Sequence, residues 1–192
     1  MSSKVRIFLI EDDRNFVSLI QKLTQKDARL DYMGHAAGIA PGVEMARKIK
    51  PDVVVIDLSL AGNELYGIEA AKKIRLTTAS KVLLLTSYDQ PEVIINACKR
   101  AFASGYLLKN QHRTLADTIY ETAMFKTPQE LFIKELLLSE LSPAERGVLD
   151  YLIAGNLYGL SSSSSKTIAN QKTSIFRKLG LKNTNELIGV FR

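Results

Sequence analysis

The sequence predicts an α/β domain built on a parallel sheet, followed by a small all-α domain. Two short apolar runs, 53–56 and 82–85, show no alternation of polar and apolar residues, which is typical of strands covered on both faces. Amphipathic stretches of helical period separate such runs, so right-handed βαβ crossovers are expected to join the strands. Beyond residue 122 the chain shows only helix signals.

Expected strands and helices alternate through the first 124 residues. Strands are expected at 4–10, 31–37, 53–57, 81–86 and 105–109, and helices at 14–26, 41–49, 66–76, 90–103 and 112–124. In the first of these helices, apolar side chains recur at the i, i+3, i+4 and i+7 positions of one face, namely Phe16, Leu19, Ile20 and Leu23. This alternation predicts five βα units.

Helix-start signals mark the remainder of the chain. Thr127 and Ser142 are each followed directly by proline and, three residues on, by glutamate, which is the pattern of an N-cap residue with a capping box. A similar signal stands at Asn183. Helices are therefore expected from residue 128, over 143–154, over 165–179 and over 184–191.

Length, charge and cysteine content indicate a cytoplasmic protein with room for one domain and a small second one. The chain has 192 residues, a formal net charge of +6 and one cysteine, Cys98. No stretch approaches the roughly 20 apolar residues of a membrane span, and the N-terminus lacks a signal-peptide pattern. The positive charge permits an anionic partner such as nucleic acid but does not require one.

Polar side chains suited to phosphoryl chemistry stand where four of the expected strands end. Asp12 and Asp13 follow the first strand, Asp57 ends the third, Thr86 the fourth and Lys109 the fifth. We expect these side chains to lie together, because the carboxyl ends of parallel strands share one edge of the sheet. Clustered carboxylates repel one another unless a cation joins them, and their oxygen ligands suit Mg²⁺. With the lysine, they predict a site at which a carboxylate accepts a phosphoryl group.

At these positions residues 1–122 resemble the receiver domain of two-component response regulators, which has a flavodoxin-like (βα)5 fold. The matching segments are Glu11-Asp12-Asp13, Asp57, Thr86-Ser87 and Tyr106-Leu107-Leu108-Lys109. The resemblance implies that a sensor histidine kinase phosphorylates Asp57 and that Lys109 pairs with the acceptor or the phosphoryl oxygens. It also implies a Mg²⁺ site, whose ligands would be Asp12, Asp13, Asp57 and the backbone carbonyl of Ser59.

The resemblance assigns the conformational switch to Thr86 and Tyr106. Thr86 would supply the switch hydroxyl and Tyr106 the switch aromatic side chain. The alternative for Tyr106 is that it is an ordinary aromatic residue of the core. The loop after Asp57 departs from the family pattern, because Ala61 replaces the usual proline and Gly67 follows ten residues after the acceptor.

Residues 140–192 resemble the LuxR/NarL-type helix-turn-helix effector domain, and residues 123–139 are expected to form a linker helix. The matching segments are 141–149, 166–180 and 181–187. The resemblance implies that the helix 165–179 enters the major groove of double-stranded DNA. An ordinary amphipathic helix with a solvated polar face would have a similar sequence. The polar residues expected to contact DNA are Lys166, Thr167, Asn170, Gln171, Lys172, Arg177 and Lys178.

One part of this effector pattern is missing. Where the family has the first helix of the helix-turn-helix motif, the chain has a shorter segment, 156–165, that contains Gly159 and five successive serines. Serine and glycine have poor helix propensity. We therefore expect that this helix is shortened or lost.

The sequence predicts a response regulator that controls transcription, and that is not an enzyme. Such regulators usually bind DNA as phosphorylation-enhanced homodimers, and by resemblance Leu187, Ile188 and Phe191 form the effector's dimer surface, although they could equally close its core. Because this segment is shortened, an alternative function stays open, in which the protein is a phosphorylation-gated protein-interaction module that no longer binds DNA. A Mg²⁺-dependent phosphohydrolase with Asp57 as nucleophile is a further alternative, but no second acid–base residue is placed for it.

Overall fold

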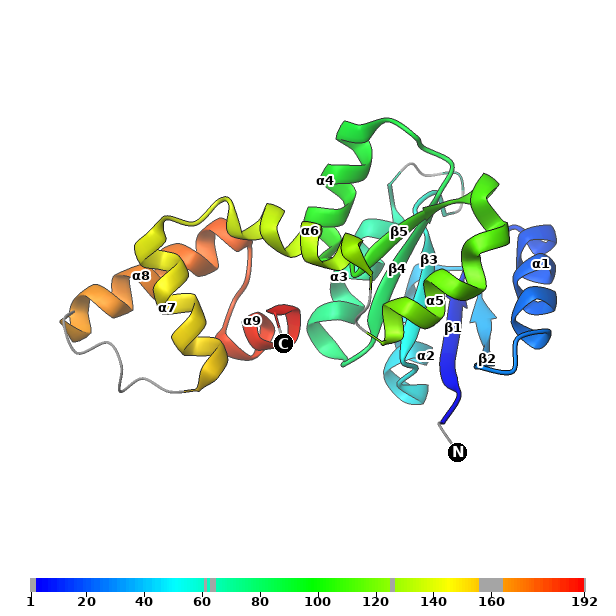
Figure 1. Ribbon diagram of the computed structural model, residues 1–192, viewed down its shortest axis with the longest axis horizontal. Helices are drawn as coiled ribbons and strands as arrows, with labels where there is room; N and C mark the ends of the chain where they lie inside the picture. The colour runs from blue at the N-terminus through cyan, green and yellow to red at the C-terminus, as the bar shows by residue number, and fades with distance from the viewer. Residues whose placement is uncertain (1–2, 61, 63–64, 125–126, 156–163, 192) are drawn as a thin grey trace. The chain divides into compact units, whose positions relative to one another are not determined.

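The computed structural model describes residues 3–60, 62, 65–124, 127–155 and 164–191. It divides into two compact units, residues 1–133 and 134–192. The division falls inside helix α6 (Pro128–Leu138), in the interval 123–139 that the sequence assigns to a linker helix. Figure 1 labels α6, whose residues belong partly to the first unit and partly to the second.

The first unit is built on a five-stranded parallel sheet in the order β2-β1-β3-β4-β5. Its strands are β1 (Val5–Ile10), β2 (Leu30–Ala36), β3 (Val53–Asp57), β4 (Lys81–Thr86) and β5 (Gly105–Leu108). Its helices are α1 (Arg14–Gln25), α2 (Ile39–Ile49), α3 (Gly67–Thr77), α4 (Pro91–Ala101) and α5 (Leu115–Ala123). The predicted alternation of strands and helices is confirmed.

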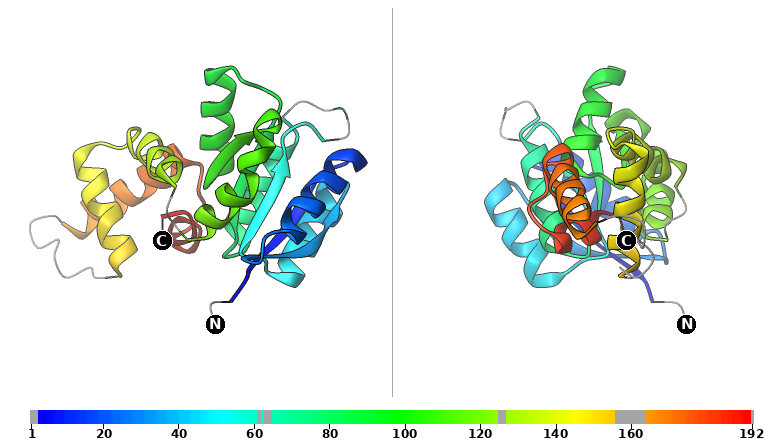
Figure 2. Two further views of the ribbon diagram at one scale, coloured as in Figure 1. Left: turned by 45° about the vertical axis from the view of Figure 1, so that its right-hand side comes forward. Right: turned by 90° about the vertical axis from the view of Figure 1, so that its left-hand side faces the viewer.

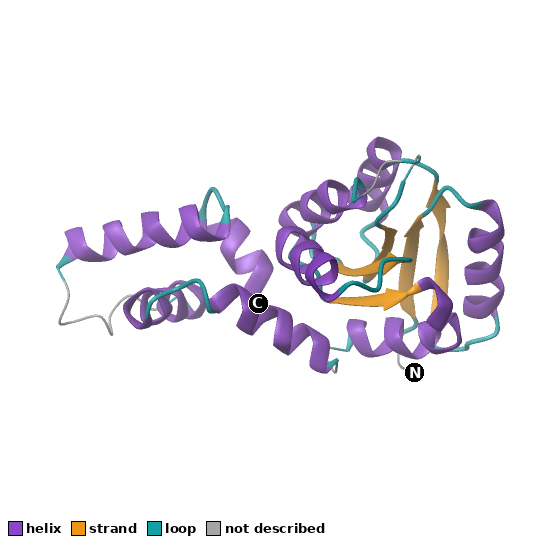
Figure 3. Ribbon diagram, turned by 90° about the horizontal axis from the view of Figure 1, so that it is seen from above, coloured by secondary structure: helices purple, strands orange, loops and turns teal. Residues whose placement is uncertain are grey.

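Apolar side chains cover both faces of this sheet. Those of α2, α3 and α4 pack on one face and those of α1 and α5 on the other. Figure 3 shows the purple helices on both sides of the orange sheet. The runs at β3 and β4 are fully buried, as their continuous apolar sequences predict.

The segment after β5 differs from its expected form. A single helix is expected over 112–124, but the chain first makes a 3₁₀ helix, η1 (Lys109–Thr114), and only then enters α5. Gln111 within η1 has non-helical backbone angles. The sheet edge and the helix are therefore joined by a tight turn that starts at Lys109.

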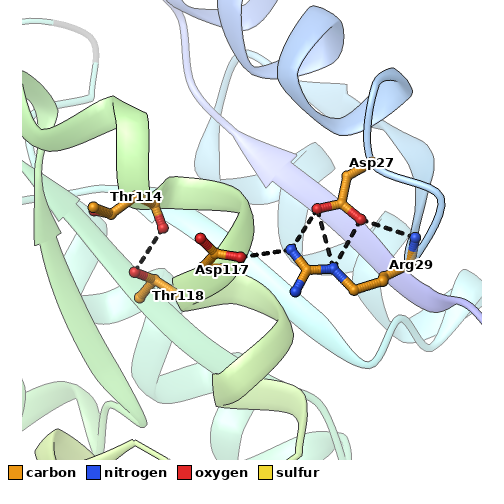
Figure 4. Close-up of polar contacts among 5 residues, drawn as sticks. All are labelled: Asp27, Arg29, Thr114, Asp117 and Thr118. Atoms are coloured by element: carbon orange, nitrogen blue, oxygen red, sulfur yellow. Dashed lines mark hydrogen bonds and ion pairs between the residues drawn. The ribbon is translucent and has the colours of Figure 1, made fainter.

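An exposed arginine ties the turn before β2 to α5. Arg29 pairs with Asp27 and with Asp117, at 2.6 Å in both cases, and its guanidinium lies 4.8 Å from the centre of the Tyr120 ring. Figure 4 shows these ion pairs, together with the hydrogen bond that Thr118 of α5 donates to the carbonyl of Thr114, the last residue of η1. Since Arg29 and Asp117 are 42% and 65% exposed, water screens this contact.

The second unit is entirely helical in its described residues. It contains the rest of α6, then α7 (Pro143–Ala154), α8 (Ser165–Leu179) and α9 (Thr184–Phe191). Both Figure 1 and Figure 2 show α8 in orange beside α7 in yellow. The capping box that the sequence predicts at Ser142 and Glu145 is present. The shortened or lost first helix of the motif falls on residues 156–163, which lie outside the described residues.

Leu187 serves the core of this unit. It is fully buried, as is its helix neighbour Val190, whereas Ile188 and Phe191 are half-buried. Of the two roles that the sequence leaves open for Leu187, the structure supports core packing.

Candidate functional site

Sheet register places the ends of four strands at one level. Ile10 of β1 pairs with Ile56 of β3, so Glu11 stands beside Asp57. Asp57 pairs with Leu85 of β4, which is followed by Thr86. Thr86 in turn pairs with Leu108 of β5, which is followed by Lys109. The chain topology thus gathers these side chains at the carboxyl edge of the sheet.

Lys109 joins two buried carboxylates at this edge. Its Nζ lies 2.7 Å from Oε2 of Glu11 and 3.0 Å from Oδ2 of Asp57. Glu11 is fully buried and Asp57 is 3% exposed. The other oxygen of Asp57 accepts a hydrogen bond from the Ser59 backbone amide at 3.2 Å, which orients the carboxylate. The Phe16 ring lies 4.9 Å from the lysine Nζ and covers it.

The carboxylates of this cluster are poorly compensated. Burial raises the pKa of Asp57, against the opposing effect of Lys109. Burial also raises the pKa of Glu11, and the charge of Asp57 acts in the same direction, against the hydrogen bond from Lys109. For Lys109, burial alone would lower the pKa, but its bonds to Glu11 and Asp57 outweigh burial and raise it. One lysine does not neutralise this site, which favours a further cation.

A group of three carboxylates meets the requirements of a metal site. Glu11, Asp12 and Asp57 each offer an oxygen, and these atoms lie within 4.8 Å of one another. Asp12 is exposed and the other two are buried, so the group opens to solvent on one side. Oxygen ligands with room for water are what Mg²⁺ prefers in proteins.

The structure does not bring Asp13 into this group, in contrast to the sequence prediction. The Asp13 carboxylate instead caps α1, where it accepts hydrogen bonds from the amides of Asn15 and Phe16. Glu11, and not Asp13, is the third carboxylate of the group with Asp12 and Asp57. The sequence contained a signal for this, because Glu11 is the first residue after the apolar strand and Asp13 directly precedes a helix, where an aspartate is a favoured N-cap.

The other two predicted residues lie on neighbouring strands. Thr86 is 1% exposed, and its Oγ1 accepts a hydrogen bond from the Tyr88 amide at 2.9 Å. A cavity of about 110 Å³ lies beside it and is lined by Thr86, Ser87, Asp89, Leu108, Lys109 and Asn110. Tyr106 is half-buried and packs against the apolar core between the sheet and α2 to α4.

Gly67 allows α3 to begin directly against the acceptor. A Cβ atom at this position would lie 2.1 Å from the carbonyl oxygen of Asp57, and the Gly67 amide donates to the carbonyl of Leu58 at 3.0 Å. Only glycine fits here. The longer loop of this chain therefore still returns to the backbone of the acceptor strand.

Most of the residues expected to contact DNA lie on the open side of α8. Lys166, Thr167, Asn170 and Arg177 are exposed, whereas Gln171 and Lys172 are half-buried. The ammonium of Lys172 lies 5.7 Å from the centre of the Phe176 ring. Ser164 caps the helix by accepting a hydrogen bond from the Thr167 amide at 3.2 Å.

Lys178 has a partner within its own unit. Its Nζ lies 2.7 Å from Oε2 of Glu145, the capping-box residue of α7, whose side chain is 8% exposed. The hydrogen bond from Lys178 holds the pKa of Glu145 down to about 2, with help from Ser174 and the Ser142 amide. A DNA contact by Lys178 would have to compete with this pair.

No helix within the described ranges has the length and apolar character needed to cross a membrane.

Comparison with known proteins identifies related sequences over nearly the whole chain. A family model described as "Response regulator receiver domain" matches residues 7–120. The transcriptional regulatory protein DesR of Bacillus subtilis is 29% identical over 192 aligned residues, which cover 96% of this chain and 94% of DesR.

Solved structures show the same fold. The RcsB response regulator of Salmonella typhimurium, described for its conformational dynamism in DNA interaction, aligns with a TM-score of 0.58 at 23% identity and covers 97% of both chains. A LuxR-family two-component response regulator from Aurantimonas sp. SI85-9A1 aligns with a TM-score of 0.59 at 26% identity and covers 72% of this chain and 98% of its own.

Proposed function

This chain belongs to the response regulator receiver family, and on that premise we propose that Asp57 accepts a phosphoryl group from a sensor histidine kinase and thereby controls transcription through residues 140–192. One observation carries the proposal. Asp57 is a buried carboxylate held by Lys109 at the sheet edge, within 4.8 Å of two further carboxylates.

In the proposed transfer, one oxygen of Asp57 forms a bond to phosphorus as the bond between phosphorus and the donor breaks. The Ser59 amide holds the second oxygen of the carboxylate and so orients the attacking one. Lys109 lies close enough to move its ion pair from the carboxylate to a phosphoryl oxygen. A positive charge in this place stabilises charge that accumulates during transfer.

Glu11, Asp12 and Asp57 would hold Mg²⁺, with the Ser59 carbonyl as a further proposed ligand. The bound ion would neutralise charge on the phosphoryl oxygens. This ligand set replaces the one expected from the sequence, in which Asp13 stood in place of Glu11.

The switch is proposed to act through Thr86 and Tyr106. Thr86 Oγ1 already accepts from the Tyr88 amide, which leaves its hydroxyl hydrogen available for a phosphoryl oxygen in the adjoining cavity. A move of Thr86 towards that group would vacate space behind it for the half-buried Tyr106 ring. The shape of the surface formed by α4, β5 and α5 would change as a result.

The proposed output is binding of double-stranded DNA by α8 in a phosphorylation-enhanced homodimer. The exposed polar residues of α8 support this role, as do the names of the relatives, since DesR is a transcriptional regulatory protein. These names favour transcription control over the interaction-module and phosphohydrolase alternatives. Both proposed partners, kinase and DNA, place the protein in the cytoplasm.

Incubation with acetyl phosphate and Mg²⁺ tests the phosphorylation. Mass spectrometry of the intact chain should show one added phosphoryl group, and Asp57→Asn should show none. Asp52→Asn, a change directly before the first residue of the same strand, is the control and should be labelled normally. Labelling of Asp57→Asn to the wild-type level would refute the assignment.

Binding to random-sequence duplex DNA, followed by gel shift against salt, tests the output. The apparent affinity of the phosphorylated protein should fall steeply with salt, because phosphate contacts release counterions. Lys166→Ala should reduce that slope, whereas Lys22→Ala on α1 should not. If the phosphorylated protein shows no shift even at low salt, the interaction-module alternative takes its place.

A further inference from the structure

Helix α6 begins as part of the first unit, although it follows the fifth βα unit of that fold. Gln129, in its first turn, accepts a hydrogen bond at Oε1 from the backbone amide of Tyr106, at 2.9 Å. The two residues are 23 positions apart in the chain. The side chain of the connecting helix is thus bonded to the backbone of the strand that carries the proposed switch tyrosine.

This amide belongs to a strand with an open edge. Strand β5 is the last of the sheet and, among the residues that the structure describes, pairs only with β4, so the amides on its outer side have no strand partner there. A half-buried amide without a hydrogen bond costs free energy, and Gln129 removes that cost. Gly105 makes the approach possible, because a Cβ atom there would lie 2.9 Å from the Gln129 oxygen.

A second anchor holds Gln129 in place. Its neighbour Glu130 forms an ion pair with Lys81, the first residue of β4, and the two side chains are 8% and 7% exposed. The charge of Glu130 also acts on the buried Arg75. One turn further on, Ile133 is 5% exposed and belongs to the apolar core of the sheet. The start of α6 is therefore held by three contacts, of which the hydrogen bond from the Tyr106 amide is one.

The bond lies close to the phosphorylation site along the chain. Strand β5 has only four residues, Gly105–Leu108, and Lys109 follows directly and is bonded to Asp57. If Lys109, the first residue of η1, transfers its ion pair to a phosphoryl group, we expect the adjoining strand β5 to shift with it. Hydrogen bonds weaken steeply with length and angle, so a small shift of Tyr106 relative to Gln129 would break this one.

We propose that Gln129 is a positioning residue that couples β5 to α6. Phosphorylation of Asp57 shifts β5 and breaks the hydrogen bond from the Tyr106 amide to Gln129, and the start of α6 is loosened as a result. This inference rests on the proposed function, since it assumes that Asp57 is phosphorylated. Because α6 continues into the second unit, the release would reach the effector through one continuous helix.

Amide hydrogen exchange of the full chain, measured by NMR, tests the resting contact. In Gln129→Met, which keeps the side-chain length but lacks the acceptor, the Tyr106 amide should exchange about tenfold faster than in the wild type. The Ser104 amide, which donates to Val82 of β4, should keep its protection and serves as the internal reference. Gln129→Glu retains an acceptor and should restore protection, and Gln21→Ala on α1 is the matched control.

Acetyl phosphate and Mg²⁺ test the coupling. Phosphorylated wild-type protein should lose protection at Tyr106 and at the amides of residues 130–133. In unphosphorylated Gln129→Met, the amides of residues 130–133 should already exchange as fast as they do in the phosphorylated wild type. Phosphorylation of this variant should change these exchange rates little. Equal Tyr106 exchange in Gln129→Met and wild type would overturn the resting contact.

Incorporation of the phosphoryl group is followed in the same samples by mass. Full incorporation with unchanged exchange at Tyr106 and α6 would overturn the coupling but leave the proposed function standing. No incorporation would overturn the proposed function and the coupling together, while the resting contact would still be judged from Gln129→Met.

Discussion

The two ends of the sheet each bury a lysine against a carboxylate, yet their charge balance is opposite. At the carboxyl end, Lys109 faces the clustered carboxylates of Glu11, Asp12 and Asp57. At the amino end of β4, the Glu130 carboxylate pairs with Lys81, and its charge also acts on Arg75. Among these named residues, negative charges outnumber positive charges at the first end but not at the second.

This difference separates a site built for a ligand from a contact built for stability. At the carboxyl end the pKa values of Asp57 and Glu11 are raised, so the ionised cluster is held at a cost that a cation would relieve. At the amino end the chain supplies its own counter-charge from α6. The sheet is therefore open to ions at one end and closed by its own helix at the other.

The largest effect is expected at the closed end. Glu130→Gln removes the negative charge from the buried ion pair with Lys81 and should lower the free energy of unfolding by about 3–5 kcal/mol. Denaturant unfolding followed by circular dichroism measures this loss. Asp117→Asn, which breaks the exposed pair with Arg29, is the control and should cost below about 1 kcal/mol. Similar losses in the two variants would contradict the contrast between buried and exposed pairs.

Mg²⁺ should have the next largest effect, at the open end. A ligand at 100 times its dissociation constant stabilises the folded state by about 2.7 kcal/mol, so the wild type should unfold at a higher temperature with Mg²⁺. Asp12→Asn should lose most of this response, because it removes one of the three clustered carboxylates.

Asp13→Asn is the matched control for the metal. Asparagine is as good an N-cap as aspartate, so this variant keeps α1 capped and should keep the full Mg²⁺ response. A lost response in Asp13→Asn with a normal one in Glu11→Gln would restore the ligand set expected from the sequence.

A third lysine–carboxylate pair gives a smaller effect that depends on pH. The pKa of Glu145 is lowered to about 2 in the folded protein, chiefly by the hydrogen bond from Lys178. The pair therefore stabilises the second unit above the usual glutamate pKa, and this contribution is lost as pH falls from about 4.5 through about 2. Unfolding of the full chain at several pH values, followed by the NMR signals of residues 134–192, should show this loss of stability. Glu145→Gln should abolish the part of the pH dependence that lies between about 4.5 and about 2.

The smallest effect is a gain of stability. Asp57→Asn removes one charge from the crowded cluster, and without Mg²⁺ it should raise the free energy of unfolding by about 0.5–1 kcal/mol. Thermal unfolding in the presence of a chelator measures it. Since Lys109 keeps its 2.7 Å pair with Glu11, the lysine is not left unpaired. A destabilised Asp57→Asn would mean that the cluster is better compensated than its raised pKa values indicate.

Much of the first unit could be predicted because its signals are local. The apolar runs of β3 and β4 identify buried strands at their observed bounds, and parallel topology then brings Asp57, Thr86 and Lys109 to one edge. The 3₁₀ helix after Lys109 was not predicted, since its polar residues carry no apolar period. The start of α6 was predicted, but not its place in the first unit.

The sequence by itself determined the order of strands and helices, the edge at which the site lies and the family to which the chain belongs, because periodicity and motif spacing are properties of neighbouring residues. The tertiary structure decided that Glu11 joins Asp12 and Asp57, because the direction of each carboxylate depends on where β1 ends and α1 begins, although the sequence already places Asp13 at a favoured N-cap position. It alone decided that Lys178 pairs with Glu145, and that Gln129 bonds to Tyr106. These contacts join residues far apart in the chain, and no local pattern encodes them.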